Sequence, residues 1–439
     1  MENIEKQKAA KVWRNAGITR NNLLTFYFLT FIGLPLMFYV SASQDFLLTT
    51  FLKIPSAEQG RIAGNLQSFR EFVILFMIGL AGILADKIGR KIVAVAGFLC
   101  LALGYVLFPL ASTVTEILPF YFISAIGAAF VTGMMSTLIA DYVANEYRGK
   151  ASGIQGVLIS LSIILVALLK GLPKYFQSAG YDEMLAGRWT YYVVAAIGAV
   201  SAVVLWLGLK GGLPTRKEER KGFSELVKEG IGAAREPGIA LSYLSAFVSR
   251  SDLAVVGVFL SLWISKYGRD VLGLDSATAA AKAGGVLAFA GITYLITAPV
   301  VGILADKVNR VNALIVASAV GFIAYCSAYF VDNPLSWRMY VVVLLVGVAQ
   351  IFGVITSQVL VSQQAPTAIR GSVIGFFGLC GAAAQIILGY FGGKLFDDWT
   401  EAGPFVLVGF FTLVLLLVAF SLKNKIKAVE DAKEFVAAH

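Results

Sequence analysis

Two pairs of ionisable side chains interrupt long apolar blocks of this chain. Arg70 and Glu71 are adjacent in one block, and Arg250 and Asp252 lie two residues apart in another. Charge within an apolar medium is costly, so such residues indicate function by default. A guanidinium can bind a carboxylate or phosphate through two hydrogen bonds, and a buried carboxylate can carry a proton. The four residues therefore predict binding of an anionic or zwitterionic solute together with proton transfer.

The arginines are the predicted solute ligands and the carboxylates are the predicted proton carriers. Arg250 lies roughly 17 Å into its block at about 1.5 Å per residue, so it is the first choice for the solute. Glu71 is the first choice for the proton, because Arg70 beside it could control when the proton leaves. Adjacent helical residues point about 100° apart, so these two need not pair. Asp252 is a further proton carrier and Asp45 a weaker one, for which a solvated loop is the alternative.

The elements that must hold these residues are membrane-spanning helices. Apolar residues form 58% of the 439 residues, charged residues form 14%, and the mean hydropathy is +0.78. Soluble domains carry about 25% charged residues, so soluble, disordered, collagen-like and disulfide-rich classes are excluded. The apolar residues come in long blocks rather than short alternating segments, which disfavours a transmembrane β-barrel.

Apolar blocks and breakers predict an all-α polytopic membrane protein with twelve transmembrane helices in two pseudo-symmetric six-helix bundles. The segments are a cytoplasmic N-terminal stretch (1–22), a first bundle (23–209), a cytoplasmic linker (210–238), a second bundle (239–422) and a cytoplasmic tail (423–439). The predicted spans are 23–44, 60–84, 92–111, 118–140, 151–172, 189–209, 239–264, 281–304, 311–330, 338–361, 370–394 and 404–422.

The positions of basic residues predict the orientation. With a cytoplasmic N-terminus, 24 of the 36 Lys and Arg fall on inner segments and 10 on outer loops and helix ends. Because basic residues mark cytoplasmic loops, we expect both termini inside and the chain in the cell (inner) membrane. The net charge of +9 then needs no nucleic-acid partner. The polar first 22 residues do not resemble a secretory signal peptide.

Other chemistry has little support in the sequence. Cys100, Cys326 and Cys380 lie inside apolar blocks without a CxxC pair, and the one histidine, His439, is the last residue. No metal-ligand cluster, phosphate-binding loop or nucleophile motif is present. We therefore expect no metal, no cofactor and no enzymatic activity. Nothing in the sequence calls for an oligomer, so a monomer in the lipid bilayer is expected.

The two halves of the chain contain a repeat. Residues 82–87, Gly-Ile-Leu-Ala-Asp-Lys, recur at 302–307, an offset of 220. Parallel repeats of this kind are a transporter design. Further repeated residues are Arg90 with Arg310, Arg148 with Arg370, Gly149 with Gly371, and Gly153 with Gly375.

The loop at 82–91 resembles the signature loop of the major facilitator superfamily, which joins spans two and three. The second copy is degraded, with Asn309 in place of glycine and Val311 in place of the last basic residue. The resemblance extends over about residues 20–422. It implies two six-helix bundles that rock around a central cavity. It also implies secondary active transport of a small organic solute, and the internal charges favour proton coupling.

The resemblance implies a conformational latch at the inner ends of the helices. Gly82 permits close helix contact, and Asp86 can accept hydrogen bonds from a neighbouring helix N-terminus. The basic residues can pair with acidic residues of the opposite half, or only set the topology. Asp141 is expected to pair with Arg148, and the Gly-x-x-x-Gly pairs are expected to form close helix contacts. The full latch set is Gly82, Asp86, Lys87, Gly89, Arg90, Lys91, Asp306, Lys307, Arg310, Asp141, Arg148 and Arg370.

The family architecture implies that spans one, four, seven and ten line the cavity. It also places Asp252 where it could meet Arg70 across the two halves and close the outer side. Satisfied ion pairs that only hold the fold are the alternative for all internal charges. Further candidate ligands on the lining spans are Tyr27, Tyr39, Thr132, Ser136, Tyr243, Gln350 and Gln358.

Three alternative functions stay open. The first is proton-antiport efflux of drugs or amphiphiles. It is weakened because span five lacks the Gly-Pro-x-x-Gly-Gly run of the family's drug antiporters and instead has Gly153, Gln155 and Gly156 without a nearby proline. The second is a passive facilitator, against which Glu71 argues. The third is a sensor that binds a solute without moving it.

Overall fold

The structure is a computed structural model that describes residues 14–15, 17–144, 147–212, 223–307, 310–366 and 369–426. The structure describes the backbone but not the side chains of residues 148, 149, 223, 224, 253 and 302–307. Predictions for the beginning of the N-terminal stretch, for linker residues 213–222 and for the end of the tail therefore lie outside the described residues. The same holds for the side chains of Arg148, Asp306 and Lys307.

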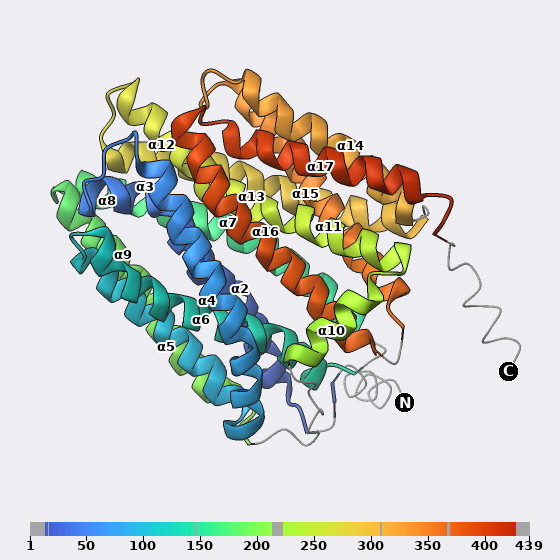
Figure 1. The fold of residues 1–439 in the computed structure, drawn as a ribbon. Coiled ribbons are helices and arrows are strands. Elements are labelled where there is room, and N and C mark those ends of the chain that lie inside the picture. The colour runs from blue at the N-terminus through green and yellow to red at the C-terminus, as the bar shows by residue number, and fades with distance from the viewer. Residues whose placement is uncertain are drawn as a thin grey trace, which may run out of the picture. The chain divides into compact units, whose positions relative to one another are not determined.

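The described chain is helical apart from one isolated bridge between Arg14 and Val143 (Figure 1). Twelve helical segments are long and apolar enough to cross a membrane, which confirms the predicted fold class. The helices are α2 (Arg20–Ala42), α3 (Gln44–Phe46), α4 (Gln59–Ile88), α5 (Arg90–Leu107), α6 (Val114–Tyr142), α7 (Arg148–Lys170), α8 (Leu172–Ser178), α9 (Glu183–Gly208), α10 (Phe223–Ala233), α11 (Pro237–Ala254), α12 (Leu260–Asp270), α13 (Ser276–Lys307), α14 (Arg310–Ser327), α15 (Trp337–Gln364), α16 (Arg370–Asp398) and α17 (Gly403–Leu422).

The first and seventh spans are both irregular. In span one, α2 and α3 are followed by a π-helical turn, Leu47–Phe51. In span seven, a π-helical turn, Val255–Phe259, joins α11 to α12. Such turns occur often at functional sites, because the extra residue shifts the helix face that carries the following side chains. Each turn lies close to an acidic residue, Asp45 in span one and Asp252 in span seven.

The chain divides into two compact units. The first unit comprises 1–218 and 256–295, and the second comprises 219–255 and 296–439. In the first unit α5 packs against α6 and α9, and α2 packs against α7. In the second unit α14 packs against α15 and α17, and α11 packs against α16. These are equivalent pairs in the two copies of the repeat, so the copies pack alike. The predicted bundles were residues 23–209 and 239–422. The units differ from them mainly in segment 256–295, which belongs to the first unit although it was predicted in the second bundle.

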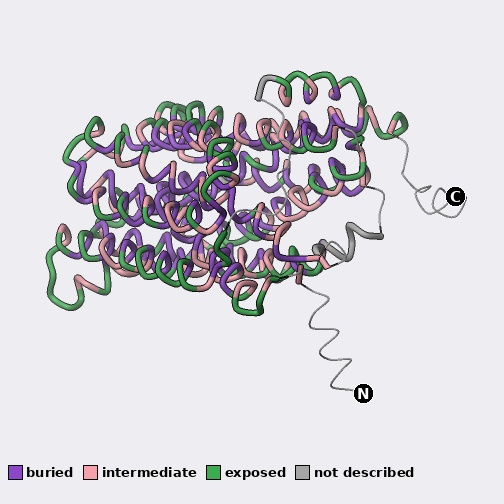
Figure 2. The backbone as a smooth tube through the Cα atoms, turned by 90° about the horizontal axis from the view of Figure 1, so that it is seen from below, coloured by how far each residue is buried: buried purple, intermediate pink, exposed green. Residues whose placement is uncertain are grey.

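Apolar side chains remain exposed along the helices. Exposed residues recur between buried ones through the length of the helices rather than only at their ends (Figure 2). A surface this rich in large apolar groups suits contact with lipid tails rather than water. Examples on different spans are Phe72, Leu103, Val203, Leu207, Ile296, Ile323, Leu344 and Leu417.

Glycine is required where α4 meets α5. Gly89 has a φ of 98°, a conformation that other residues rarely adopt. A methyl group on Gly89 would also lie only 2.8 Å from the carbonyl oxygen of Gly212, at the start of the linker. Both constraints explain the glycine of the signature loop.

The members of the Gly-x-x-x-Gly pairs are packed unequally. A methyl group on Gly375 would lie 2.8 Å from Cδ1 of Leu226 on α10, so a close helix contact occurs there. A methyl group on Gly153 or Gly371 would meet no described atom within 4 Å beyond its own helix backbone. A close approach of two helix backbones occurs between α5 and α6. A methyl group on Gly127 would lie 2.7 Å from the carbonyl oxygen of Gly97 and 2.9 Å from the backbone nitrogen of Leu101.

We predict that Gly127→Ala lowers the thermal stability of the purified protein, because two backbones must separate to admit a methyl group. The expected loss is about 1–3 kcal/mol. The control is Gly153→Ala, which should be neutral or stabilising by up to about 1 kcal/mol, since alanine favours the helix. Thermal unfolding in detergent measures both variants. Equal melting temperatures for the two variants would contradict the proposed contact.

Candidate functional site

Arg250 lies on α11 with its side chain exposed. It passes beside Gly381 of α16, because a methyl group on Gly381 would lie 2.6 Å from Cγ and 3.2 Å from Cβ of Arg250. The glycine therefore leaves the space that the aliphatic part of the arginine occupies. Any larger residue at Gly381 would force the guanidinium to another position. The predicted solute ligand thus lies at an open surface of the second unit.

Arg70 and Glu71 form an ion pair inside the first unit. The distance from Arg70 Nη1 to Glu71 Oε1 is 2.9 Å, and both side chains are buried. The prediction that the two need not pair underestimated the reach of the guanidinium, which bends back along α4. Arg70 Nη2 also donates to the carbonyl oxygen of Met37 at 2.9 Å. Arg70 is therefore held by α2 and α4, while its buried Nε has no hydrogen-bond partner.

Two neutral side chains extend this pair toward α2. Gln67 Nε2 donates to Glu71 Oε1 at 3.2 Å, and Ser41 Oγ donates to Gln67 Oε1 at 2.8 Å. All four side chains of this chain of contacts are buried, namely Ser41, Gln67, Glu71 and Arg70. The carboxylate of Glu71 thus accepts hydrogen bonds from at least one charged and one neutral donor. A proton on Glu71 would weaken both contacts.

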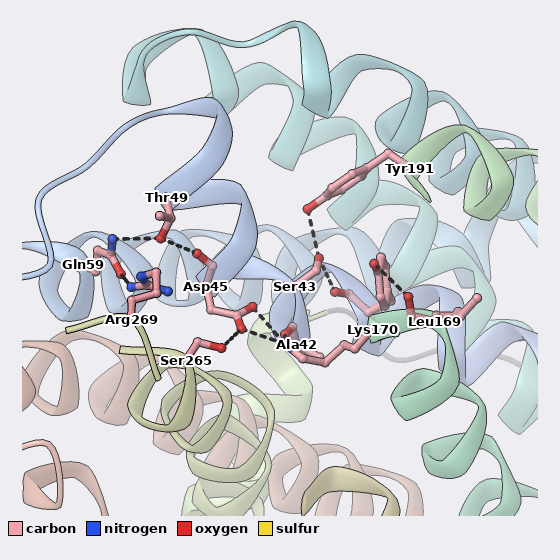
Figure 3. A network of polar contacts seen from close by, with 11 residues as sticks. Ala42, Ser43, Asp45, Thr49, Gln59, Leu169, Lys170, Tyr191, Ser265 and Arg269 are labelled. Atoms are coloured by element: carbon pink, nitrogen blue, oxygen red, sulfur yellow. Dashed lines mark hydrogen bonds and ion pairs between the residues drawn. The ribbon is translucent and has the colours of Figure 1, made fainter. Parts of the chain in front are cut away.

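A second buried ion pair joins Asp45 to Lys170 (Figure 3). Lys170 Nζ lies 2.8 Å and 2.9 Å from the two carboxylate oxygens, and it also donates to the carbonyl oxygen of Ala42. The two side chains are 0% and 1% exposed. The alternative of a solvated loop for Asp45 is therefore wrong. The cause is that α3 continues span one past Ala42 and turns Asp45 inward, toward the end of α7.

Residues from the seventh span complete this network. Ser265 of α12 donates to Asp45 Oδ2, and Arg269 Nη2 donates to Gln59 Oε1 at 2.8 Å. Gln59 in turn donates to Thr49, which donates to the carbonyl oxygen of Asp45 (Figure 3). The first unit therefore contains a polar cluster drawn from both halves of the sequence. We call Asp45, Lys170, Ser265, Gln59 and Arg269 the end cluster.

Asp252 is buried in the second unit. Its carboxylate faces a small cavity that is also lined by Ser249, Ser318 and Tyr325. Arg250, two residues earlier, lies beside α16, so the two residues point to different sides of α11, as expected for this spacing. The predicted outer gate between Asp252 and Arg70 stays a prediction; within the first unit Arg70 binds Glu71 and the carbonyl oxygen of Met37.

Two of the predicted aromatic ligands are used in packing. Tyr39 is buried, donates to the carbonyl oxygen of Leu169 at 3.5 Å, and packs against the rings of Tyr105 and Tyr191. Tyr243 is buried too. It donates to the carbonyl oxygen of Gly230 at 3.1 Å, and so holds α10 against the second unit.

The remaining candidates differ in accessibility. Tyr27 is half-buried, and its hydroxyl oxygen has no hydrogen-bond partner among the described residues. Gln358 is exposed and Gln350 is buried. Thr132 Oγ1 lies 3.8 Å from the sulfur of Met37, and Ser136 donates to the carbonyl oxygen of Gly133. The hydroxyl oxygen of Tyr27 is itself buried, so Gln358 is the most accessible of these side chains.

The signature loop is organised by Arg90. The guanidinium binds Asp86 and, at 3.0 Å, Asp141 Oδ2. The predicted pair of Asp141 with Arg148 lies outside the described side chains, and the predicted contact with the opposite half stays a prediction. Within the described residues, Arg90 binds two acidic residues of its own half. The reason is proximity, since α4, α5 and α6 meet at this corner. The ammonium of Lys91 lies 4.8 Å from the ring centre of Trp206.

The other latch residues are less informative. Gly82 is buried, in keeping with close packing, and Lys87 is exposed. In the second half Arg370 is exposed and Arg310 is half-buried. The latch in the second half therefore cannot be compared with the Arg90 arrangement, because the side chains of Asp306 and Lys307 lie outside the described residues.

Four members of the end cluster were missed from the sequence: Gln59, Lys170, Ser265 and Arg269. Lys170 stands at the last turn of an apolar block, where a lysine normally extends to the membrane surface. Arg269 also stands at a helix end, and Ser265 is one serine among many. One pattern did indicate that Lys170 is not at the end of its span. The chain continues through Gly171 and Pro173 to Ser178, so the fifth span extends beyond the lysine.

The chain resembles known transporters over nearly its full length. It matches the model of the Major Facilitator Superfamily over residues 22–389. It is 28% identical to the magnetosome protein MamH of Paramagnetospirillum magneticum, over 91% of this chain and 92% of MamH. It is 25% identical to MamZ of the same organism, and the matching region covers 92% of this chain and 63% of MamZ. Multidrug resistance protein 3 of Bacillus subtilis is 27% identical, over 43% of this chain and 36% of that protein.

Solved transporter structures share the fold. The nucleoside transporter NupG has a TM-score of 0.68 at 17% identity, covering 93% of this chain and 100% of NupG. The D-xylose-proton symporter has a TM-score of 0.66 at 16% identity, covering 93% and 99%. At these identities the likeness shows the fold alone. With the family match over most of its length, this chain belongs to the Major Facilitator Superfamily.

Proposed function

We propose that the protein is a secondary active transporter of a small organic anion or zwitterion, which works by alternating access and is coupled to protons. The observation that carries this proposal is the exposure of Arg250 within a membrane span. It lies thirteen residues after the start of α11 at Pro237, which is about 20 Å along the helix. A guanidinium facing lipid at that depth would be costly, so an exposed one belongs in a water-filled cavity.

An arginine in such a cavity attracts a negative group. Its planar donors match a carboxylate or phosphate with two hydrogen bonds, which gives both charge and orientation. Gly381 supports this role, because it gives the arginine stem room beside α16. Gln358, which is exposed on α15 of the same unit, is proposed as a neutral ligand.

The Arg70–Glu71 pair supports proton coupling. Both groups are buried in a membrane span, where a carboxylate must be either paired or protonated. Protonation of Glu71 would release Arg70 from its only described carboxylate partner, and the free Nε of Arg70 could then take part in new contacts. We therefore propose Glu71 as the proton carrier and Arg70 as the residue that positions it, rather than as a direct solute ligand.

The end cluster is proposed as a gate. Asp45 and Lys170 belong to the first half of the sequence, whereas Ser265 and Arg269 belong to the second half. Contacts between halves at one end of the spans are what alternating access must break and remake. We propose that this end is the outer one, that both termini are cytoplasmic, and that the protein acts as a monomer in the inner membrane.

Drug efflux is the alternative, since several multidrug transporters are similar at low identity. MdtG of Salmonella typhimurium is 24% identical over 66% of this chain. The proteins named as magnetosome proteins match 88% of the chain or more. This broader match favours a solute other than drugs. It also makes the membrane of an internal compartment a second candidate location, which imaging of a tagged chain would test.

We predict that Arg250→Ala abolishes stabilisation of the protein by its solute. A panel of carboxylates, phosphates and zwitterions should contain a compound that raises the melting temperature of the wild type in detergent. The variant should lose that rise, and Arg250→Lys should keep part of it, because it keeps the charge but not the planar donors. Arg338→Ala, at an exposed arginine near the start of α15, is the control. Full stabilisation of Arg250→Ala would refute the assignment.

We predict that Glu71→Gln uncouples transport. In proteoliposomes the wild type should accumulate the solute found above when a pH gradient is imposed, and a protonophore should collapse that accumulation. The glutamine cannot exchange a proton, so gradient-driven accumulation should fall at least about tenfold while solute exchange at equilibrium continues. Glu58→Gln, at an exposed glutamate next to the start of α4, should behave as the wild type. Undiminished accumulation by Glu71→Gln would exclude Glu71 as the carrier.

We predict that Asp45 and Lys170 stabilise the fold as a pair. Asp45→Asn or Lys170→Met alone leaves one buried charge without its partner and should cost about 3–5 kcal/mol. The double variant removes both charges and should recover most of the loss. Thermal unfolding measures the cycle, with Lys174→Met at an exposed lysine as control. Additive losses in the double variant would show that the two side chains do not act on one another.

A further inference from the structure

A small cavity lies inside the second unit, between α11, α14, α15 and α17. Its volume of about 20 Å³ is enough for one water molecule or an ion of similar size. Glycine and alanine form part of the wall, which leaves space beside the polar groups. Six lining side chains carry oxygen atoms: Ser245, Ser249, Asp252, Ser318, Tyr325 and Thr412.

The carboxylate of Asp252 is only partly compensated. The residue is 3% exposed, and its Oδ1 accepts no hydrogen bond from the described residues. No lysine or arginine lines the cavity. A buried carboxylate with an unsatisfied oxygen is costly unless a positive charge or a proton joins it. Tyr325 is a polar neighbour of Asp252 in the same cavity, but it carries no positive charge, so a cation or a proton would lower the cost of burying this carboxylate.

Three of the five hydroxyl groups that line the cavity donate their protons to backbone carbonyl oxygens of their own helices. Ser245 donates to the carbonyl oxygen of Ser242 at 2.8 Å, and Ser318 donates to that of Leu314 at 2.8 Å. Thr412 donates to the carbonyl oxygen of Val408 at 2.7 Å. A hydroxyl has one proton and two lone pairs, so these three oxygens can offer only lone pairs to the cavity. Acceptors of this kind suit a cation and repel an anion.

We propose that this cavity binds one small monovalent cation, with Asp252 as the charged ligand and the hydroxyl oxygens of Ser245, Ser318 and Thr412 as neutral ligands. A single carboxylate balances a single charge, whereas Ca²⁺ and Mg²⁺ sites use several oxygen ligands with more charge or bound water. The ion is Na⁺ or a proton, which share the need for a buried anionic oxygen. Its role as a coupling ion rests on the proposed function, but its binding does not.

The geometry links the ion to the solute site through one helix. Asp252 and the proposed solute ligand Arg250 are separated by one residue on α11, and the π-helical turn begins at Val255. Tyr325 is the other titratable side chain that lines the cavity. Binding of an ion in the cavity therefore affects the segment of α11 that carries Arg250. This segment ends where the α-helical hydrogen bonds give way to the π-helical turn at Val255.

The test measures binding to the full chain in detergent without any transport. Thermal unfolding is compared in NaCl, LiCl, KCl and choline chloride at equal ionic strength, and at several values between about pH 5 and pH 9. For a Na⁺ site the wild type should gain about 2–4 °C in NaCl over choline chloride, with saturation. Asp252→Asn should lose this gain, and the control Asp332→Asn, at an exposed aspartate, should keep it.

A proton site gives a different pattern. No metal ion should then shift the melting temperature, but the wild type should become less stable than Asp252→Asn as the pH rises, because the aspartate must lose its proton inside the protein. The proposal is overturned if no ion stabilises the wild type and if its difference from Asp252→Asn is the same at every pH. Normal ion binding in the Glu71→Gln and Arg250→Ala proteins would separate this site from a failure of the proposed transport mechanism.

Discussion

Charge inside an apolar medium must be neutralised within the protein, and this constraint explains most of the polar architecture. Arg70 is held by Glu71, Lys170 is held by Asp45, and Arg90 is held by Asp86 and Asp141. In each case the partner is near in space within one compact unit. The bilayer offers no water to take the place of a partner, so each pair fixes the positions of the helices that carry it. The structure thus uses its internal charges first to join helices.

Two internal charges on α11 carry the functional proposals. Arg250 is exposed within a span, and Asp252 has a carboxylate oxygen without a hydrogen bond from the described residues. Both lie next to a π-helical turn, on different sides of the helix. We propose Arg250 as the ligand of an anionic group and Asp252 as the ligand of a small cation, so that one helix would carry both sites.

The large features of this protein could be predicted from its sequence, because they depend on patterns that the bilayer imposes. Twelve apolar blocks, the repeat at an offset of 220 and the glycine of the signature loop all have local physical causes. The pairings could not be predicted. Lys170 and Arg269 stand at helix ends, where basic residues are ordinary, and Asp141 had two basic residues within reach. The choice of Arg90 depends on how three helices meet, which no spacing in the chain reveals. Tyr39 and Tyr243 were plausible ligands by position, but burial inside their own units determines their roles.

The assignment of residues 256–295 to the first unit has a consequence for the order of biosynthesis. A growing chain completes its first six spans before α12 has been made, so Asp45 and Lys170 are inserted into the bilayer without Ser265 and Arg269. The early intermediate therefore keeps an ion pair whose outer hydrogen bonds are still missing. Only the arrival of the seventh and eighth spans finishes that core, which makes the second half of the chain a folding partner for the first.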